Sequence, residues 1–239
     1  MSVARRHIAP SKKVKTQDKL SVVILAAGTG RRMIAKGSRS LMLLNKTTCV
    51  LQHQINTIMS VYPNADIVAV TGFEHEKVRK HMYGQKVRFV QNYQYEHRGM
   101  AHGLSLGLDA CTVSPVLVMH GDIVFNKHTL VGIDNASCVL LAPKNISRNK
   151  IGVTIQDGVA THFSYTMPEK WGQIAFFQDK ELDLLRSVVF DDGSGHLLLY
   201  EVLNRVIDNG GTLKCHTSDK MDIVEIDKNK DLQYARTII

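Results

Sequence analysis

Short apolar runs alternate with amphipathic segments along the first half of the chain. Four runs have the length and composition of buried strands: residues 22–27, 65–71, 87–91 and 116–120. Three segments between them place apolar side chains at helical spacing: residues 51–59, 74–83 and 100–110. Strands separated by helical segments of about ten residues are typical of βαβ units. The pattern predicts an α/β fold with a mainly parallel sheet, in which ligands bind at the carboxyl ends of the strands.

The second half of the chain is less regular. We expect four further strands, at residues 138–142, 153–155, 172–177 and 223–226. We expect three further helices, at residues 182–189, 197–208 and 229–235. The helix over 197–208 is followed by Asn209-Gly210-Gly211, which is a helix stop signal. No internal repeat divides the chain, so a single folded domain is expected.

The formal net charge of +8 is concentrated at the N-terminus. Residues 1–19 contain six Lys or Arg residues and one Asp, a net charge of +5, leaving +3 for residues 20–239. We expect a basic flexible tail over residues 1–19 and a folded domain over residues 20–239. The charge therefore does not indicate nucleic-acid binding, while a nonspecific anion-binding arm and a transit peptide stay open as functions of the tail.

Neither the cysteines nor the apolar runs indicate a secreted or membrane protein. The four cysteines are widely separated and form no C-x-x-C pair, so no zinc site or disulfide framework is expected. No apolar run approaches the roughly 18 residues that a membrane span needs. We expect a cytoplasmic protein that does not contact a membrane, and the sequence leaves its oligomeric state open.

A glycine-rich loop directly follows the first strand. Gly28-Thr29-Gly30 lets the backbone turn sharply and point several N–H groups at one place, which suits phosphate oxygens. Arg31 and Arg32 add permanent positive charge beside it. A nucleoside triphosphate is therefore a sensible ligand. The loop lacks the Gly-Lys-Ser/Thr of a Walker motif and the third glycine of a dinucleotide fingerprint.

The nine residues 25–33 read LAAGTGRRM and resemble the L-A-A-G-x-G-x-R-M signature of the nucleotidyltransferases that make activated sugars and alcohols. This resemblance implies a single-domain, three-layer Rossmann-like fold around a mixed sheet. It also implies that the nucleotide is bound by Leu25, Ala26, Ala27, Gly28, Thr29, Gly30, Arg31 and Arg32.

Three later segments resemble the same family, in the family's order. Residues 98–108 (RGMAHGLSLGL) resemble its G-T-A-H-A-L segment, which adds Gly99, Met100 and Ala101 to the predicted nucleotide contacts. Gly121-Asp122 resembles the Gly-Asp pair whose carboxylate holds magnesium. Residues 224–232 (VEIDKNKDL) resemble the late E-I-D-T-P-E-D-L element, whose acid completes the metal site. The resemblance thus implies Mg²⁺ as cofactor, held by Asp122, Asp227 and Glu225.

The implied reaction is attack by a phosphate oxygen of an acceptor on the α-phosphorus of a nucleoside triphosphate, with release of pyrophosphate. Arg32, Arg39 and Asp122 are the predicted catalytic residues. Arg39 departs from the family, because aligning Leu41 puts Ser38-Arg39 on the family's Pro-Lys. An arginine keeps the charge but replaces a compact ammonium with a planar fork. We expect Arg39 to contact phosphate, with Lys36 or Lys46 as alternatives.

The acceptor is left open between a sugar phosphate and a phosphocholine-like small phosphate, with CTP or UTP as the favoured triphosphate and sugar nucleotide biosynthesis as a role. Trp171-Gly172 resembles a stretch of phosphocholine-activating enzymes, although a core tryptophan is an equal alternative. A metal-dependent glycosyltransferase is one rival, disfavoured because "HGDIVF" lacks Asp-x-Asp. A nucleotide-binding homologue without catalysis is another, and Arg39 is the feature that favours it.

Overall fold

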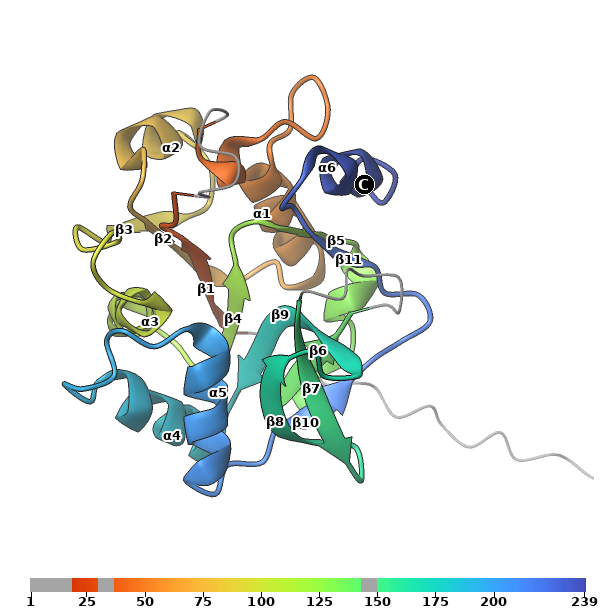
Figure 1. Ribbon diagram of the computed structural model, residues 1–239. Helices are drawn as coiled ribbons and strands as arrows, with labels where there is room; N and C mark the ends of the chain where they lie inside the picture. The colour runs from red at the N-terminus through yellow and green to blue at the C-terminus, as the bar shows by residue number, and fades with distance from the viewer. Residues whose placement is uncertain (1–18, 30–36, 143–149) are drawn as a thin grey trace, which may run out of the picture.

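The structure is a computed structural model that describes residues 19–29, 37–142 and 150–239. In this part of the chain, nine strands form one sheet in the order β3-β2-β1-β4-β9-β6-β10-β8-β7 (Figure 1). Their bounds are β1 (Ser21–Ala26), β2 (Asp66–Thr71), β3 (Arg88–Gln91), β4 (Val116–His120), β6 (Cys138–Leu141), β7 (Ile151–Gln156), β8 (Val159–Tyr165), β9 (Glu169–Phe177) and β10 (Lys214–His216). The α/β fold class is confirmed.

Parallel pairing holds for the first half of the sheet. Strands β3, β2, β1 and β4 are parallel neighbours, as the alternation of apolar and amphipathic segments predicts. Beyond β4, strand β9 runs antiparallel to both β4 and β6, while β10 is parallel to β6. The carboxyl ends of β1 and β4 therefore meet at one edge of the sheet, which is where this topology places ligands.

The expected helices are all present, with ends within a few residues of the predicted ones. They are α1 (Val50–Val61), α2 (His75–His81), α3 (Met100–Ala110), α4 (Asp179–Val189), α5 (Leu199–Asp208) and α6 (Asn229–Ala235). Short 3-10 helices, which sequence patterns do not reveal, cover Arg39–Leu41, Lys127–Leu130 and Ile133–Asn135. In Figure 1, α1 and α2 lie on one side of β1, and α3, α4 and α5 lie on the other.

Strand β1 is apolar throughout because both of its faces are covered. Val23 and Leu25 belong to the core under α3, α4 and α5, whereas Val22 and Ile24 belong to the core under α1 and α2. A strand buried on both faces reads as a continuous apolar run rather than an alternating one. Strand β1 therefore belongs to both cores, and it is paired on both sides, with β2 and with β4.

The hairpin of β7 and β8 was missed in part, because β8 was not predicted. The two strands are joined by Asp157-Gly158, and both residues have positive φ, of 51° and 78°. Such a two-residue turn matches the twist of the paired strands, and Asp-Gly is a strong sequence signal for it. The signal was therefore present in the sequence. The short strand β10 is set by pairing with β6 and carries no comparable local signal.

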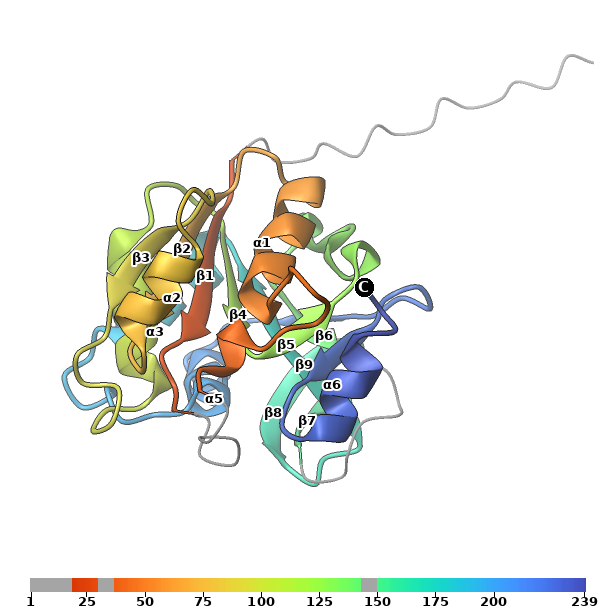
Figure 2. The same ribbon diagram turned by 90° about the horizontal axis from the view of Figure 1, so that it is seen from above.

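A second, two-stranded sheet pairs β5 (Ile123–Phe125) with β11 (Ile223–Glu225) in antiparallel register. Helix α6 packs on this pair (Figure 2), burying Val124, Val224, Ile226 and Ala235 in a third small core. The pairing returns the C-terminal segment to the end of β4. This places the late acidic motif at the edge where β1 and β4 end.

Two further expectations concern the N-terminal tail and contact with a membrane. Residues 1–18 of the predicted basic tail lie outside the described residues, so the tail stays a prediction. In the ranges that the structure describes, no helix has the length and apolar character needed to span a membrane.

Two glycines of α3 provide a matched test of how tightly this helix packs on the sheet. A Cβ on Gly107 would lie 2.5 Å from Val23 Cγ1, whereas on Gly103 the nearest atom would be 3.6 Å away. We expect Gly107→Ala to lower the free energy of unfolding by about 1–3 kcal/mol through overpacking. Gly103→Ala should raise it by about 0.5–1 kcal/mol through helix propensity. Urea titration measures both, and equal effects of the two substitutions would contradict this packing.

Candidate active site

A pocket lies at the carboxyl ends of β1 and β4. It is lined by Leu25, Ala26, Gly28, Ser38, Arg39, Ser40, Met100, His120, Gly121 and Asp122. The glycine turn after β1 and the Gly-Asp pair after β4 therefore share one cavity. Of the other predicted loop contacts, Ala27 and Thr29 are described, while Gly30, Arg31 and Arg32 lie outside the described residues.

Gly121 makes the close approach of the two strand ends feasible. Its N–H donates to Leu25 O at 2.8 Å. A Cβ at position 121 would lie 2.6 Å from Ala26 Cβ and 2.9 Å from Ala26 Cα, closer than real Cβ contacts allow. The absence of a side chain there sets Asp122 directly beside the glycine turn.

The ladder between β5 and β11 brings the three predicted metal acids together. Glu225 pairs with Ile123, one residue after Asp122. The chain then continues so that Ile226 N donates to Asp122 O at 2.9 Å, and Asp227 follows. More than 100 residues separate Asp122 from Asp227 in sequence, yet their side chains reach the same neighbours.

Two cations lie among these acids. Arg39 Nη1 lies 2.7 Å from Asp122 Oδ2 and 3.1 Å from Asp227 Oδ1. Lys150 Nζ lies 2.6 Å from Glu225 Oε2 and also contacts Asp227 Oδ2. Sequence reasoning missed Lys150, because its surroundings (SRNKIGV) do not distinguish it from a surface lysine. The site is therefore a network of three carboxylates and two cations.

Burial and crowding of like charges shift the titration of this network. Burial, together with the Asp227 charge, raises the pKa of Asp122, although the nearby Arg39 opposes the rise. Burial and the Asp122 carboxylate likewise raise the pKa of Glu225. For Lys150, burial acts to lower the pKa, but Glu225 and Asp227 outweigh it and raise the pKa. Among the described residues, the three acids are thus contacted by two cations, and burial and mutual repulsion of the acids oppose their ionisation.

The donor set fits a hard divalent cation in its chemistry, although the carboxylates do not form an open metal site. Within the described ranges, no three His, Cys, Asp or Glu side chains have the arrangement of a metal site. Arg39 and Lys150 stand between the carboxylates instead. Asp122 Oδ1 is buried and accepts no hydrogen bond from the described part of the chain. Carboxylate oxygens are the ligands that Mg²⁺ prefers, so Mg²⁺ would have to share or replace contacts of these two cations.

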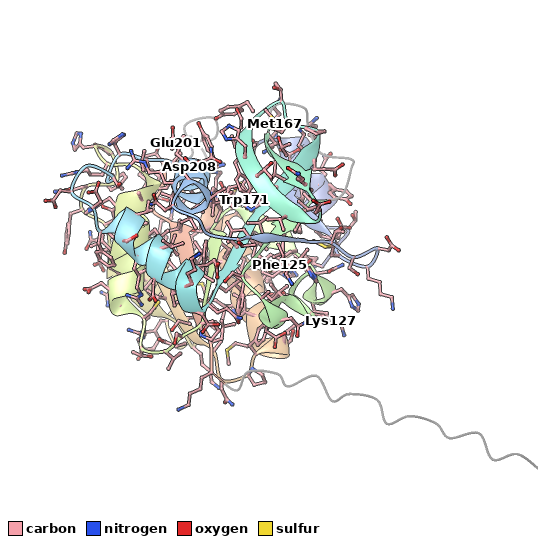
Figure 3. The ribbon with its side chains drawn as sticks, turned by 90° about the horizontal axis from the view of Figure 1, so that it is seen from below. Phe125, Lys127, Met167, Trp171, Glu201 and Asp208 are labelled. Atoms are coloured by element: carbon pink, nitrogen blue, oxygen red, sulfur yellow. The ribbon has the colours of Figure 1, made fainter. Side chains whose placement is uncertain are left out.

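His120 and Trp171 form the inner wall behind the pocket. Burial lowers the pKa of His120 to about 4, so its imidazole is neutral at pH 7. Its ring meets Trp171 edge-on at 5.9 Å between centroids. Trp171 is only 4% exposed and donates from Nε1 to Ile174 O at 3.0 Å. Figure 3 shows Trp171 inside the molecule, among the strands, so it is a core residue and does not present a face to the pocket.

The segment predicted to hold the base packs against the loop before α5. The N–H of Gly99 donates to Gly195 O at 2.9 Å, and that of Ala101 donates to Leu197 O at 3.0 Å. Both amides therefore already have partners. Met100 lies between them at the start of α3 and lines the pocket.

The chain is similar in sequence to known proteins over part of its length. The family model of the MobA-like NTP transferase domain matches residues 22–136. The bifunctional protein GlmU of Francisella tularensis subsp. novicida (strain U112) is 35% identical over 104 residues, which are 44% of this chain and 22% of that protein. The match thus spans about a fifth of the length of such curated relatives.

Solved structures resemble nearly the whole chain. The CTP:phosphocholine cytidylyltransferase from Streptococcus pneumoniae has a TM-score of 0.78 at 17% identity, covering 92% of this chain and 98% of its own. The inositol-1-phosphate CTP transferase from T. maritima has a TM-score of 0.73 at 17% identity, covering 91% of this chain and 94% of its own. At such identities these two structures establish the fold. The resemblance drawn from the sequence motifs is thus confirmed: residues 22–136 match the family model of the MobA-like NTP transferase domain, within a chain that has the fold of these two solved transferases.

Proposed function

We propose that this protein is a Mg²⁺-dependent nucleotidyltransferase. It joins a nucleoside triphosphate, with CTP or UTP favoured, to a phosphorylated sugar or small alcohol and releases pyrophosphate. The observation that carries the proposal is the shared pocket, in which the glycine turn after β1 faces Asp122, Arg39 and, through Arg39, Asp227. Solved structures with this fold include two that transfer a cytidylyl group by their titles, and these support the favoured triphosphate.

The reaction forms a bond between an acceptor phosphate oxygen and the α-phosphorus, and breaks the bond from the α-phosphorus to the bridging oxygen of the β-phosphate. All reacting groups are anions, so positioning and neutralisation supply most of the catalysis. Arg39 stands where it can contact the phosphates from the Asp122 side, and Gly28 lines the same pocket from the end of β1. Bound to Asp122, Glu225 and Asp227, Mg²⁺ would neutralise charge on the phosphate oxygens.

Some predicted contacts stay predictions. Arg32, together with Arg31 and Gly30, would hold the β- and γ-phosphates, and these residues lie outside the described ranges. No covalent nucleophile is required. His120 is an unsuitable general base, because burial lowers its pKa to about 4 and a phosphate acceptor is already deprotonated near neutral pH.

The buried tryptophan bears on the acceptor. A quaternary amine such as choline is recognised over an exposed aromatic face. Trp171 offers no such face, because it is only 4% exposed, packs in T-shaped contacts with His120 and Phe163, and donates its indole N–H to the backbone. We therefore favour an acceptor that is recognised by hydrogen bonds to hydroxyl groups, as in a sugar or polyol phosphate.

A nucleotide-binding protein without catalysis is the second candidate. The observation that favours it is that Arg39 and Lys150 already form ion pairs with the carboxylates that would hold Mg²⁺. A glycosyltransferase is less well supported, because the segment after β4 offers Asp122 without a second nearby acid. The nucleotidyltransferase and the non-catalytic nucleotide-binding protein differ in one measurable product, because only the enzyme releases pyrophosphate.

We expect pyrophosphate release only when a triphosphate, Mg²⁺ and a phosphorylated acceptor are all present. A coupled pyrophosphate assay of the four triphosphates against hexose 1-phosphates, inositol 1-phosphate and phosphocholine measures this. Asp122→Ala should reduce the rate by at least about 1,000-fold, because it removes the central charged ligand. Tight triphosphate binding without pyrophosphate for any acceptor would instead favour the non-catalytic protein.

Substitutions of Arg39 test whether one positively charged nitrogen is sufficient, or whether the planar guanidinium group is needed. Its Nη1 atom alone reaches Asp122, Asp227 and Ile226 O. A lysine ammonium can replace one nitrogen, so Arg39→Lys should retain kcat/KM within about tenfold. Arg39→Met should lower kcat/KM by about 100-fold or more. Arg79→Met is the control, because Arg79 pairs only with the exposed Glu76 within α2. An active Arg39→Met enzyme would show that Arg39 is dispensable.

The raised pKa of Asp122 predicts that this acid lowers stability at neutral pH. Between its ordinary value of 3.8 and the raised value, the folded protein holds more protons than the unfolded one, so stability falls as pH rises through this window. Asp122→Asn should therefore melt above wild type at pH 7–8, and the gain should shrink toward pH 4.

Asp66 is the matched control for this melting experiment. Burial acts to raise the pKa of Asp66, but hydrogen bonds from Arg88 and Thr112 outweigh it and lower the pKa. Asp66→Asn should therefore melt below wild type at pH 7, and the loss should diminish as pH falls below about 4. If both asparagine variants shifted the melting temperature in the same direction, the electrostatic account of the site would fail.

A further inference from the structure

Strand β9 carries an irregularity beside the candidate active site. Its pairing with β6 passes from Ala175, opposite Val139, to Trp171, opposite Leu141. Three residues of β9 therefore face one residue of β6. Such bulges bend a strand and re-aim a side chain, and they occur next to active sites. The re-aimed side chain here is that of Gln173.

Gln173 adopts a conformation that lowers the stability of the folded protein. Its φ of 60° lies in the left-handed region, which favours glycine or asparagine over a longer side chain. The residue is 9% exposed, and its Oε1 is buried without a hydrogen-bond partner among the residues that the structure describes. Backbone strain and a buried unpaired carbonyl both reduce stability. Neither feature is explained by packing of the sheet.

What the strained residue gains is a contact with the acidic cluster. Gln173 Nε2 donates to Glu225 Oε2, the same oxygen that lies 2.6 Å from Lys150 Nζ. The side chain of Gln173 also lies near the His120 ring on the neighbouring strand β4, without a hydrogen bond of normal geometry between them. Glu225 is thus contacted by the Lys150 ammonium and by the uncharged amide of Gln173.

We propose that Gln173 is a positioning residue that fixes the Glu225 carboxylate, and through it Lys150, in the geometry needed for nucleotidyl transfer. The inference rests on the proposed function and adds a residue that acts through the cluster without touching the reacting atoms. Residues that orient the charged groups of a site typically change activity 10–100-fold when removed. The bulge in β9 then directs the Gln173 side chain from the central sheet toward Glu225.

The first test compares Gln173→Gly with Asp157→Gly. Both replace a residue of positive φ by glycine, but Asp157 lies in the exposed turn between β7 and β8. Gln173→Gly should lower kcat by about 10–100-fold, with KM for the triphosphate changed less than about threefold. Asp157→Gly should leave both constants unchanged. Wild-type kcat for Gln173→Gly would overturn the inference.

The second test does not depend on activity. Melting temperatures are measured for wild type, Gln173→Gly, Glu225→Gln and the double variant. If Gln173 stabilises the Glu225 carboxylate, the effect of Gln173→Gly on the melting temperature should differ between the wild-type and the Glu225→Gln backgrounds. We expect the substitution to be more favourable, by about 2 °C or more, in the Glu225→Gln background. Equal shifts in both backgrounds would overturn the inference. A wild-type protein that released no pyrophosphate would reject the proposed function instead, and the melting cycle would still decide the role of Gln173.

Discussion

The antiparallel pairing of β5 with β11 is the constraint on which the candidate active site depends. It returns the chain, after about a hundred residues, to the end of β4 and sets Glu225 and Asp227 beside Asp122. The small core under α6 stabilises this pairing by burying Val224 and Ile226. Without it, the glycine turn and the Gly-Asp pair would face a site with one acid. The charge network is thus a consequence of a short ladder between distant segments.

The network itself is more easily explained by function than by stability. Buried carboxylates that crowd one another raise each other's pKa, and the cations that accompany them contribute mainly by offsetting the cost of burial. Arg39 and Lys150 do this here from two different parts of the chain. Carboxylates and cations gathered beside one pocket suit the proposed site, which would bind a polyanion together with a divalent ion. The strained Gln173 belongs to the same arrangement.

The site extends well beyond the segment that matches the family model. Residues 22–136 supply the glycine turn, Arg39 and Asp122, and the helix that starts at Met100. The remaining described residues supply Lys150, Gln173, Glu225 and Asp227, through β7, β9 and the end of β11. The candidate site is therefore assembled from both halves of the chain.

The sequence by itself determined the strands and helices of the first half and the glycine turn, because local periodicity and a contiguous nine-residue motif carry that information. Asp122, Glu225 and Asp227 were predicted as metal ligands through the family resemblance, and their role stays a prediction. Ends of elements differed by a few residues, and β8 was missed although Asp157-Gly158 signalled its turn. Only the tertiary structure decided that Arg39 bridges Asp122 and Asp227, that Lys150 joins them, that Trp171 is buried, and that a bulge aims Gln173 at Glu225. These facts depend on side chains from distant segments meeting in one low-dielectric volume. No local pattern in the chain encodes such a meeting.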